Sequence, residues 1–156
     1  MRVIMFLLML SAAPASAAWT QQQLAEFAQN SSLQFSVQSN KLDTPSRFSA
    51  AITLQNNSAH ALPAGEADWQ IYFHLIRRIE PTRQQGLQVE HVQGDLHRIR
   101  PIAGFAGLKP SQQLTLPFES APWMVSYSDF MPRAFIAFAK LQAEVFTNTD
   151  TEDFRQ

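Results

Sequence analysis

The sequence has 156 residues, a formal net charge of −1 and no cysteine. This length suits about one domain, and the near-neutral charge excludes the strongly basic surface of a nucleic-acid-binding protein. The absence of cysteine excludes a disulfide framework, a thiolate nucleophile and a zinc–thiolate site.

The first 17 residues have the three parts of a secretory signal peptide. A positive start at Met1-Arg2 precedes an apolar run from Val3 to Leu10, and Ala15-Ser16-Ala17 has the small side chains that signal peptidase accepts. A membrane anchor or a buried strand is the alternative, but the apolar run is far shorter than the roughly 20 residues that span a bilayer. We therefore predict cleavage after Ala17 and a mature protein that is periplasmic or secreted, without membrane attachment.

A short amphipathic helix and its lead-in are predicted over residues 18–32. Thr20 is a residue type that caps helices, and Leu24, Phe27 and Ala28 fall on one helical face. The pattern predicts a helix that ends near Asn30.

Beyond this helix the apolar residues recur with a period of two, which is typical of half-buried strands. Strands are predicted at Leu33–Val37, Phe48–Leu54, Trp69–Ile76, Gln88–Val92, Leu96–Arg100, Leu114–Phe118, Trp123–Tyr127 and Phe135–Phe138. The run from Trp69 is apolar on both faces, which favours a central strand covered on both sides. Gly94-Asp95 is short enough for a hairpin turn.

Short strands separated by turn residues predict an all-β fold. We expect an antiparallel β-sandwich, similar to immunoglobulin-like domains or polysaccharide-binding modules, over residues 33–146. The acidic segment 147–156 is predicted to be a linker-like tail.

The sequence contains no convincing catalytic or metal site. His91, His97 and Asp95 gather around the predicted hairpin turn, but their spacing matches no familiar metal-ligand pattern. The other acidic residues are scattered, and neither a nucleophile elbow nor a phosphate-binding glycine loop occurs. We therefore predict a chain that is not an enzyme and needs no metal or cofactor.

Aromatic side chains offer a binding chemistry instead, because the apolar faces of sugar rings pack on aromatic rings. The candidates are Trp19, Trp69, Trp123, Tyr72 and Tyr127. Trp69 opens the most apolar strand, which favours a place in the core over a sugar contact. For Trp123 and Tyr127 exposure and burial are equally compatible with the sequence. Several arginines either hydrogen-bond a sugar or merely solvate a sheet face, namely Arg77, Arg78, Arg98, Arg100 and Arg133.

Six motifs follow one another along the chain: Trp69-Gln70-Ile71-Tyr72-Phe73-His74, His91-Val92-Gln93-Gly94-Asp95-Leu96, Phe105-Ala106-Gly107, Trp123, Ser128-Asp129-Phe130-Met131-Pro132-Arg133 and Asn148-Thr149-Asp150-Thr151-Glu152. In this order they resemble the N-terminal domain of bacterial chitobiases, the family-20 β-N-acetylhexosaminidases. The resemblance covers roughly residues 30–153. It implies a β-sandwich similar to polysaccharide-binding modules, which in the family precedes a smaller α/β domain and a catalytic barrel.

The resemblance further implies chitin-type or N-acetylglucosamine-containing glycans as ligands, and a hexosaminidase catalytic domain as a second partner. No catalytic residue carries over, because the Asp-Glu pair belongs to the barrel. The family commonly has a further aromatic residue after Pro-Arg, where this chain has Ala134. On side-chain chemistry we select Trp123, Tyr127, Trp69 and Arg133 as carbohydrate-binding residues. The alternative is a scaffold domain of a split or truncated hexosaminidase that packs on the catalytic domain and binds no sugar itself.

Overall fold

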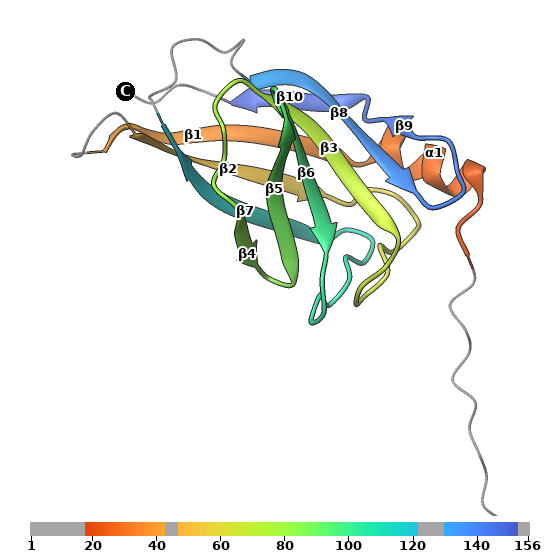
Figure 1. The fold of residues 1–156 in the computed structure, drawn as a ribbon. Coiled ribbons are helices and arrows are strands. Elements are labelled where there is room, and N and C mark those ends of the chain that lie inside the picture. The colour runs from red at the N-terminus through yellow and green to blue at the C-terminus, as the bar shows by residue number, and fades with distance from the viewer. Residues whose placement is uncertain (1–17, 43–46, 122–129, 153–156) are drawn as a thin grey trace, which may run out of the picture.

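The computed structural model describes residues 18–42, 47–121 and 130–152. In these residues it contains the helix α1 (Gln21–Asn30) and the strands β1 (Ser32–Leu42), β2 (Arg47–Gln55), β3 (Trp69–Leu75), β4 (Thr82–Gln84), β5 (Leu87–Gln93), β6 (Leu96–Pro101), β7 (Gln113–Ser120), β8 (Phe130–Phe138), β9 (Glu144–Val145) and β10 (Asn148–Glu152). The strands form two sheets, in the orders β10-β1-β2-β7 and β4-β5-β6-β3-β8-β9. Figure 1 shows the six-stranded sheet in front of the other. The predicted β-sandwich with a short N-terminal helix is confirmed.

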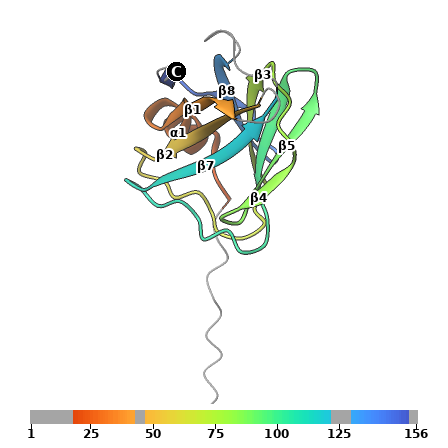
Figure 2. The same cartoon turned by 90° about the vertical axis from the view of Figure 1, so that its left-hand side faces the viewer.

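The hydrophobic core lies between the two sheets. In Figure 2, β1 and β2 lie on one side of the molecule and β4 and β5 on the other. Phe35 of β1 and Phe73 of β3 meet across the gap, with ring centroids 5.6 Å apart, and both side chains are fully buried. Each such side chain contributes roughly 1.5–3 kcal/mol through its burial. The side chains that point the other way therefore form the two outer faces of the sandwich.

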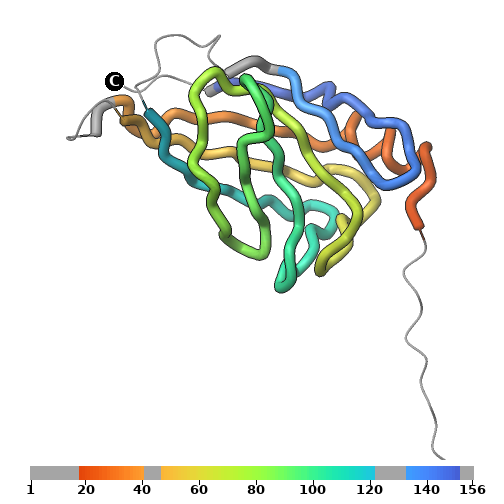
Figure 3. The backbone as a smooth tube through the Cα atoms, viewed as in Figure 1, coloured from red at the N-terminus to blue at the C-terminus, as the bar shows by residue number. Residues whose placement is uncertain are grey.

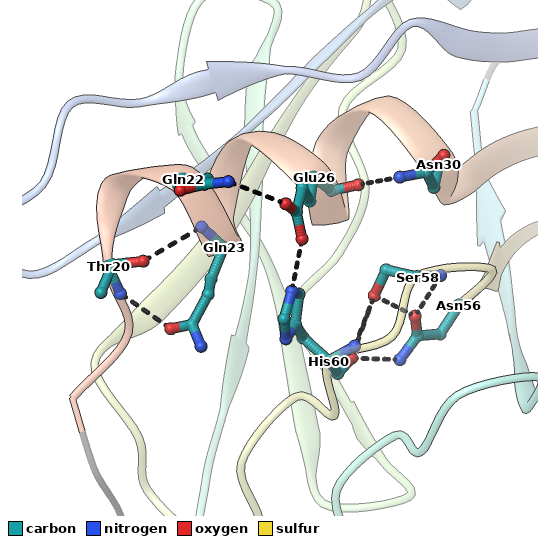
Figure 4. A network of polar contacts seen from close by, with 8 residues as sticks. All are labelled: Thr20, Gln22, Gln23, Glu26, Asn30, Asn56, Ser58 and His60. Carbon is teal, nitrogen blue, oxygen red and sulfur yellow. Dashed lines mark hydrogen bonds and ion pairs between the residues drawn. The ribbon is translucent and has the colours of Figure 1, made fainter.

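The helix α1 is fixed at its N-terminus, on its buried face and on the side opposite that face. Thr20 and Gln23 form a capping box, in which each side chain bonds the backbone N–H of the other residue (Figure 4). Phe27 is fully buried. On the opposite side His60 contacts the Glu26 carboxylate at 2.7 Å, and this hydrogen bond is the main cause that lowers the pKa of Glu26. The predicted helix and its end at Asn30 are confirmed.

The strand β3 is central, as predicted, but it is covered on one face only. Its neighbours are β6 and β8. Trp69, Ile71, Phe73 and Leu75 are buried, whereas the residues between them are half-buried. The prediction that both faces are covered is therefore wrong. Tyr72 makes the sequence apolar at a position whose side chain points away from the core.

The acidic tail is also not a free linker over the described residues. Asn148–Glu152 forms β10, which pairs with β1 in parallel from Ser32↔Asn148 to Ser36↔Glu152. In the tube of Figure 3 this last segment runs back along β1. Backbone hydrogen bonds make such a pairing without any apolar period in the sequence. Within the described part of the chain, no helix is long and apolar enough to cross a membrane.

Candidate functional site

The outer face of the six-stranded sheet carries the candidate site. Directly paired residues of antiparallel strands share a face of the sheet. Tyr72 pairs with Arg98 of β6 on one side and with Phe135 of β8 on the other. The same row continues to Glu90 of β5 and to Val145 of β9. One row across the sheet thus changes from charged to aromatic to aliphatic side chains.

An apolar ridge stands on the β3 and β8 part of this face. The rings of Tyr72 and Phe135 are stacked, with centroids 4.9 Å apart and an angle of 14° between their planes. This separation equals the spacing of neighbouring strands, so the rings stand side by side rather than lying flat on the sheet. Both are half-buried, and Val145 beside Phe135 is 60% exposed. The ridge therefore offers accessible apolar surface in a fixed orientation.

A polar lattice, formed by the hydrogen-bonded side chains of Gln70, Gln88, Glu90, Arg98 and Arg100, adjoins the ridge on the side of β6. The Tyr72 hydroxyl donates to Gln70 Oε1 at 2.5 Å, and Arg98 Nη1 donates to the same oxygen at 3.3 Å. Arg98 Nε donates to Glu90 Oε1 at 3.0 Å. The ridge and the guanidinium are thus held in register by a shared glutamine side chain.

The lattice extends to a second arginine. Arg100 Nε donates to Glu90 Oε1 at 3.0 Å and its Nη2 donates to Gln88 Oε1 at 2.8 Å. Gln88 Nε2 in turn donates to Glu90 Oε2 at 3.0 Å. A guanidinium has five N–H groups, which is more than these contacts occupy. The lattice therefore presents oriented donors that still have capacity for a ligand's oxygen atoms.

The charges of the lattice persist across the neutral pH range. Partial burial raises the pKa of the Glu90 carboxyl, but the hydrogen bonds from Arg98 and Arg100 outweigh this effect, so the pKa lies below its ordinary value. Partial burial likewise lowers the pKa of Arg98, but its hydrogen bond to Glu90 outweighs it and the pKa is raised. Both groups are charged when the face meets a ligand.

A shallow hollow lies beside the lattice, at the α1 end of the face. Its volume is about 230 Å³, and its lining residues are Asp68, Gln70, Ala137, Phe138 and Ala139. One of these residues, Phe138, stacks on the Trp19 ring with centroids 5.2 Å apart. The lining combines apolar side chains with one carboxylate and one amide, and Gln70 links the hollow to the ridge through its bond from the Tyr72 hydroxyl.

A second hollow, of about 470 Å³, lies between the β4–β5 turn and the β6–β7 connection. Its lining includes Gly86, Phe105 and Leu108 but no charged side chain. A Cβ atom on Gly86 would lie 2.3 Å from the Phe105 backbone, so this turn requires glycine. The lining offers little to orient a ligand, and we place the candidate site on the outer face.

The four selected binding residues fare differently. Trp69 is fully buried, with its ring 5.5 Å from that of Phe105, so its selection as a carbohydrate-binding residue is wrong and its place in the core is confirmed. Arg133 is exposed on β8. Trp123 and Tyr127 lie outside the described residues.

Phe135 is the residue that sequence reasoning missed. Its neighbour Ala134, which replaces an aromatic residue of the family, is buried and faces the core, so this position does not contribute to the outer face. Phe135 lies in the continuous apolar run Ala134–Phe138, so the sequence does not show which face it takes. Only the structure shows it half-buried between buried Ala134 and Ile136 and paired with Tyr72.

The predicted hairpin turn brings His91 and His97 together as a directly paired couple, with ring centroids 5.2 Å apart. His97 is fully buried. Its Nε2 accepts the Ile79 N–H at 3.1 Å, so its Nδ1 carries the proton and donates to the Asp95 carbonyl at 3.0 Å. Across residues 18–42, 47–121 and 130–152, no group of three or more His, Asp or Glu side chains is placed to hold a metal.

Burial lowers the pKa of His97 to about 4, whereas an unfolded histidine titrates near pH 6.5. Between these two pH values the unfolded chain binds more protons than the folded chain. The contribution of His97 to the free energy of unfolding is therefore fully present above about pH 6.5 and is lost as the pH drops toward about 4. We expect a loss of about 3 kcal/mol from this residue over that range. Urea unfolding at several pH values measures it.

The variant His97→Gln keeps an acceptor for the Ile79 N–H and removes the titrating ring, so its unfolding free energy should depend less on pH. His91→Gln is the matched control and should keep most of the wild-type dependence, because burial contributes more than the charge of His91 to the lowered pKa of His97. Parallel curves for the wild type and His97→Gln would contradict this account.

The two-sheet architecture defines a β-sandwich domain over the described residues. The chain belongs to the family described as "Putative carbohydrate binding domain", whose pattern matches residues 23–156. The predicted family membership is confirmed.

Two relatives resemble the chain in sequence. It is 34% identical over 86 residues to the N,N′-diacetylchitobiase of Vibrio harveyi, and 32% identical over 102 residues to the β-hexosaminidase of Vibrio vulnificus. These matches cover 55% and 65% of the chain but only 10% and 12% of the relatives. The chain thus corresponds to about a tenth of each relative's length.

Two solved structures share the fold. The GH20 exo-β-N-acetylglucosaminidase of Vibrio harveyi, solved with N-acetylglucosamine, matches 82% of the chain and 20% of its own length, with a TM-score of 0.58 and 18% identity. A family GH18 chitinase of Chromobacterium violaceum matches 87% of the chain and 20% of its own length, with a TM-score of 0.51 and 17% identity. At these identities the likeness concerns the fold alone.

Proposed function

We propose that the chain is a non-catalytic domain that binds chitin-type oligosaccharides on the outer face of its six-stranded sheet. The observation that carries the proposal is the apolar ridge of Tyr72 and Phe135 beside the fixed donors of Arg98. Sugar rings combine an apolar C–H face with a rim of oxygen atoms, and binding sites for small ligands combine apolar surface with a few oriented polar groups. The ridge packs against the apolar face of the sugar ring, and the arginine of the lattice donates hydrogen bonds to its oxygen atoms.

The names of the relatives support an N-acetyl sugar, because one relative is an N,N′-diacetylchitobiase and the GH20 structure holds N-acetylglucosamine. The hollow beside Gln70 supports the same choice. Its lining has the apolar side chain of Ala137 for an acetyl methyl group and the Gln70 amide for the acetamido group. Export to the periplasm or the medium, as the first 17 residues predict, would bring the domain to such glycans.

Isothermal titration of the protein with chitin tetrasaccharide tests the proposal. Cellotetraose, which has hydroxyls in place of acetamido groups, is the matched sugar. We expect saturable binding of the chitin oligomer and weaker binding of cellotetraose. The absence of any heat of binding at millimolar concentrations of either sugar would favour the scaffold interpretation instead.

Filling the hollow should remove the preference for the N-acetyl sugar. The variant Ala137→Leu places a larger side chain in the lining of the hollow. We expect about tenfold weaker binding of chitin tetrasaccharide and little change in the affinity for cellotetraose. Ala106→Leu, in the other hollow, is the control and should bind as the wild type does. Equal losses for both sugars in Ala137→Leu would mean that the hollow does not select the acetamido group.

A further inference from the structure

On the β4–β6 part of the outer face, positively charged side chains outnumber negatively charged ones. Arg83 of β4 pairs with Gln88, and Gln88 pairs with Arg100 on its other side, so both arginines share the outer face. With Arg98, three guanidinium groups meet the single carboxylate of Glu90 there. This part of the face carries an excess of positive charge, although the whole chain has a net charge of −1.

The carboxylates of Asp95 and Asp68 form no ion pair with these arginines within the described part of the chain. Asp95 lies at the hairpin turn and contacts His74 at 3.4 Å, and Asp68 lies in the hollow beyond Gln70. The Glu90 carboxylate forms ion pairs with both Arg98 and Arg100, so one negative charge is shared by two positive charges. Arg83 is exposed and forms no ion pair within the described part of the chain.

The strand that carries Arg83 is held in place. Gln84 Nε2 donates to the Pro117 carbonyl and Gln85 Nε2 to the Thr115 carbonyl, each at 2.7 Å. These bonds tie the β4–β5 hairpin to the edge of β7. Because β4 lies two strands from β6, Arg83 and Arg100 stand on lines roughly 10 Å apart. That separation is of the order of a disaccharide unit.

We propose that the outer face prefers glycans with carboxylate groups on the sugars that neighbour the N-acetyl sugar at the ridge. This inference rests on the proposed function, because it extends the same site from β3 and β8 toward β4. A guanidinium pairs with a carboxylate through two parallel hydrogen bonds. A glycan that lies across the strands, with its N-acetyl sugar at Tyr72, brings its next sugars over Arg100 and then over Arg83.

Titration of the full chain with two tetrasaccharides tests the inference. In one, N-acetylglucosamine alternates with glucuronic acid, and the other is chitin tetrasaccharide. At low salt we expect about tenfold tighter binding of the acidic sugar. The advantage should disappear near 1 M salt, where the Debye length is about 3 Å.

Arg83→Gln isolates the charge because Arg83 takes no part in the lattice. We expect about threefold to fivefold weaker binding of the acidic sugar, the effect of one exposed ion pair, and unchanged binding of chitin tetrasaccharide. Lys109→Gln removes the same charge from the β6–β7 connection and should change neither. If chitin binds and the acidic sugar binds no tighter, this inference fails and the proposed function survives. If neither sugar binds, both fail.

Discussion

Replacement of Trp69 by alanine is expected to lower the free energy of unfolding by about 3–5 kcal/mol. Trp69 is the largest of the fully buried side chains, and it begins the central strand of the six-stranded sheet. Its removal leaves a cavity between β3 and Phe105 that the surrounding side chains cannot fill. A loss of this size is a large share of the 5–15 kcal/mol that stabilises a typical domain.

The matched variant is Trp69→Phe. The Trp69 Nε1–H is buried and has no hydrogen-bond partner within the described part of the chain, so phenylalanine removes an unsatisfied polar group along with part of the ring. We expect Trp69→Phe to cost clearly less than Trp69→Ala in urea unfolding. A small loss in the alanine variant would show that Trp69 is not in the core.

Replacement of Tyr72 by alanine is expected to weaken the binding of chitin tetrasaccharide at least tenfold, which corresponds to about 1.4 kcal/mol. The substitution removes half of the apolar ridge, and it removes the hydroxyl that fixes Gln70 beside Arg98. Because Tyr72 is only half-buried, the fold should persist. Isothermal titration gives the affinity, and urea unfolding of the same sample verifies the fold.

Two further variants separate the parts of this effect. Tyr72→Phe keeps the ridge and loses the hydroxyl, so we expect an affinity between those of the wild type and the alanine variant. Thr53→Ala removes a side chain from the outer face of the other sheet, where Thr53 contacts Thr115, and it should bind as the wild type does. Wild-type affinity in Tyr72→Ala would place the binding site elsewhere.

Most of the fold is predictable because its signals are local. The Thr20 cap and the spacing of Leu24 and Phe27 determine α1, and the alternation around Phe35 determines β1. The tail Asn148–Glu152 has no such signal. Its place in the sheet comes from backbone pairing with β1, to which side-chain periodicity contributes nothing.

The candidate site is less predictable because it depends on register. Tyr72 and the arginines are recognisable in the sequence as residue types suited to sugar contacts, but their meeting with Phe135 and Glu90 requires the pairing of four strands. Trp69 and Tyr72 lie in one apolar run, and the observed burial pattern separates the core residue Trp69 from the half-buried residue Tyr72. The near-neutral net charge likewise conceals the local excess around Arg83.

Mapping of chemical-shift changes on ¹⁵N-labelled protein, titrated with chitin tetrasaccharide, tests the central claim most directly. We expect the amide signals of β3, β6 and β8 around Tyr72, Arg98 and Phe135 to shift in a saturable manner, while those of β1, β2 and β7 stay in place. Saturable shifts confined to β1, β2 and β7, or no shifts at millimolar sugar, would contradict it.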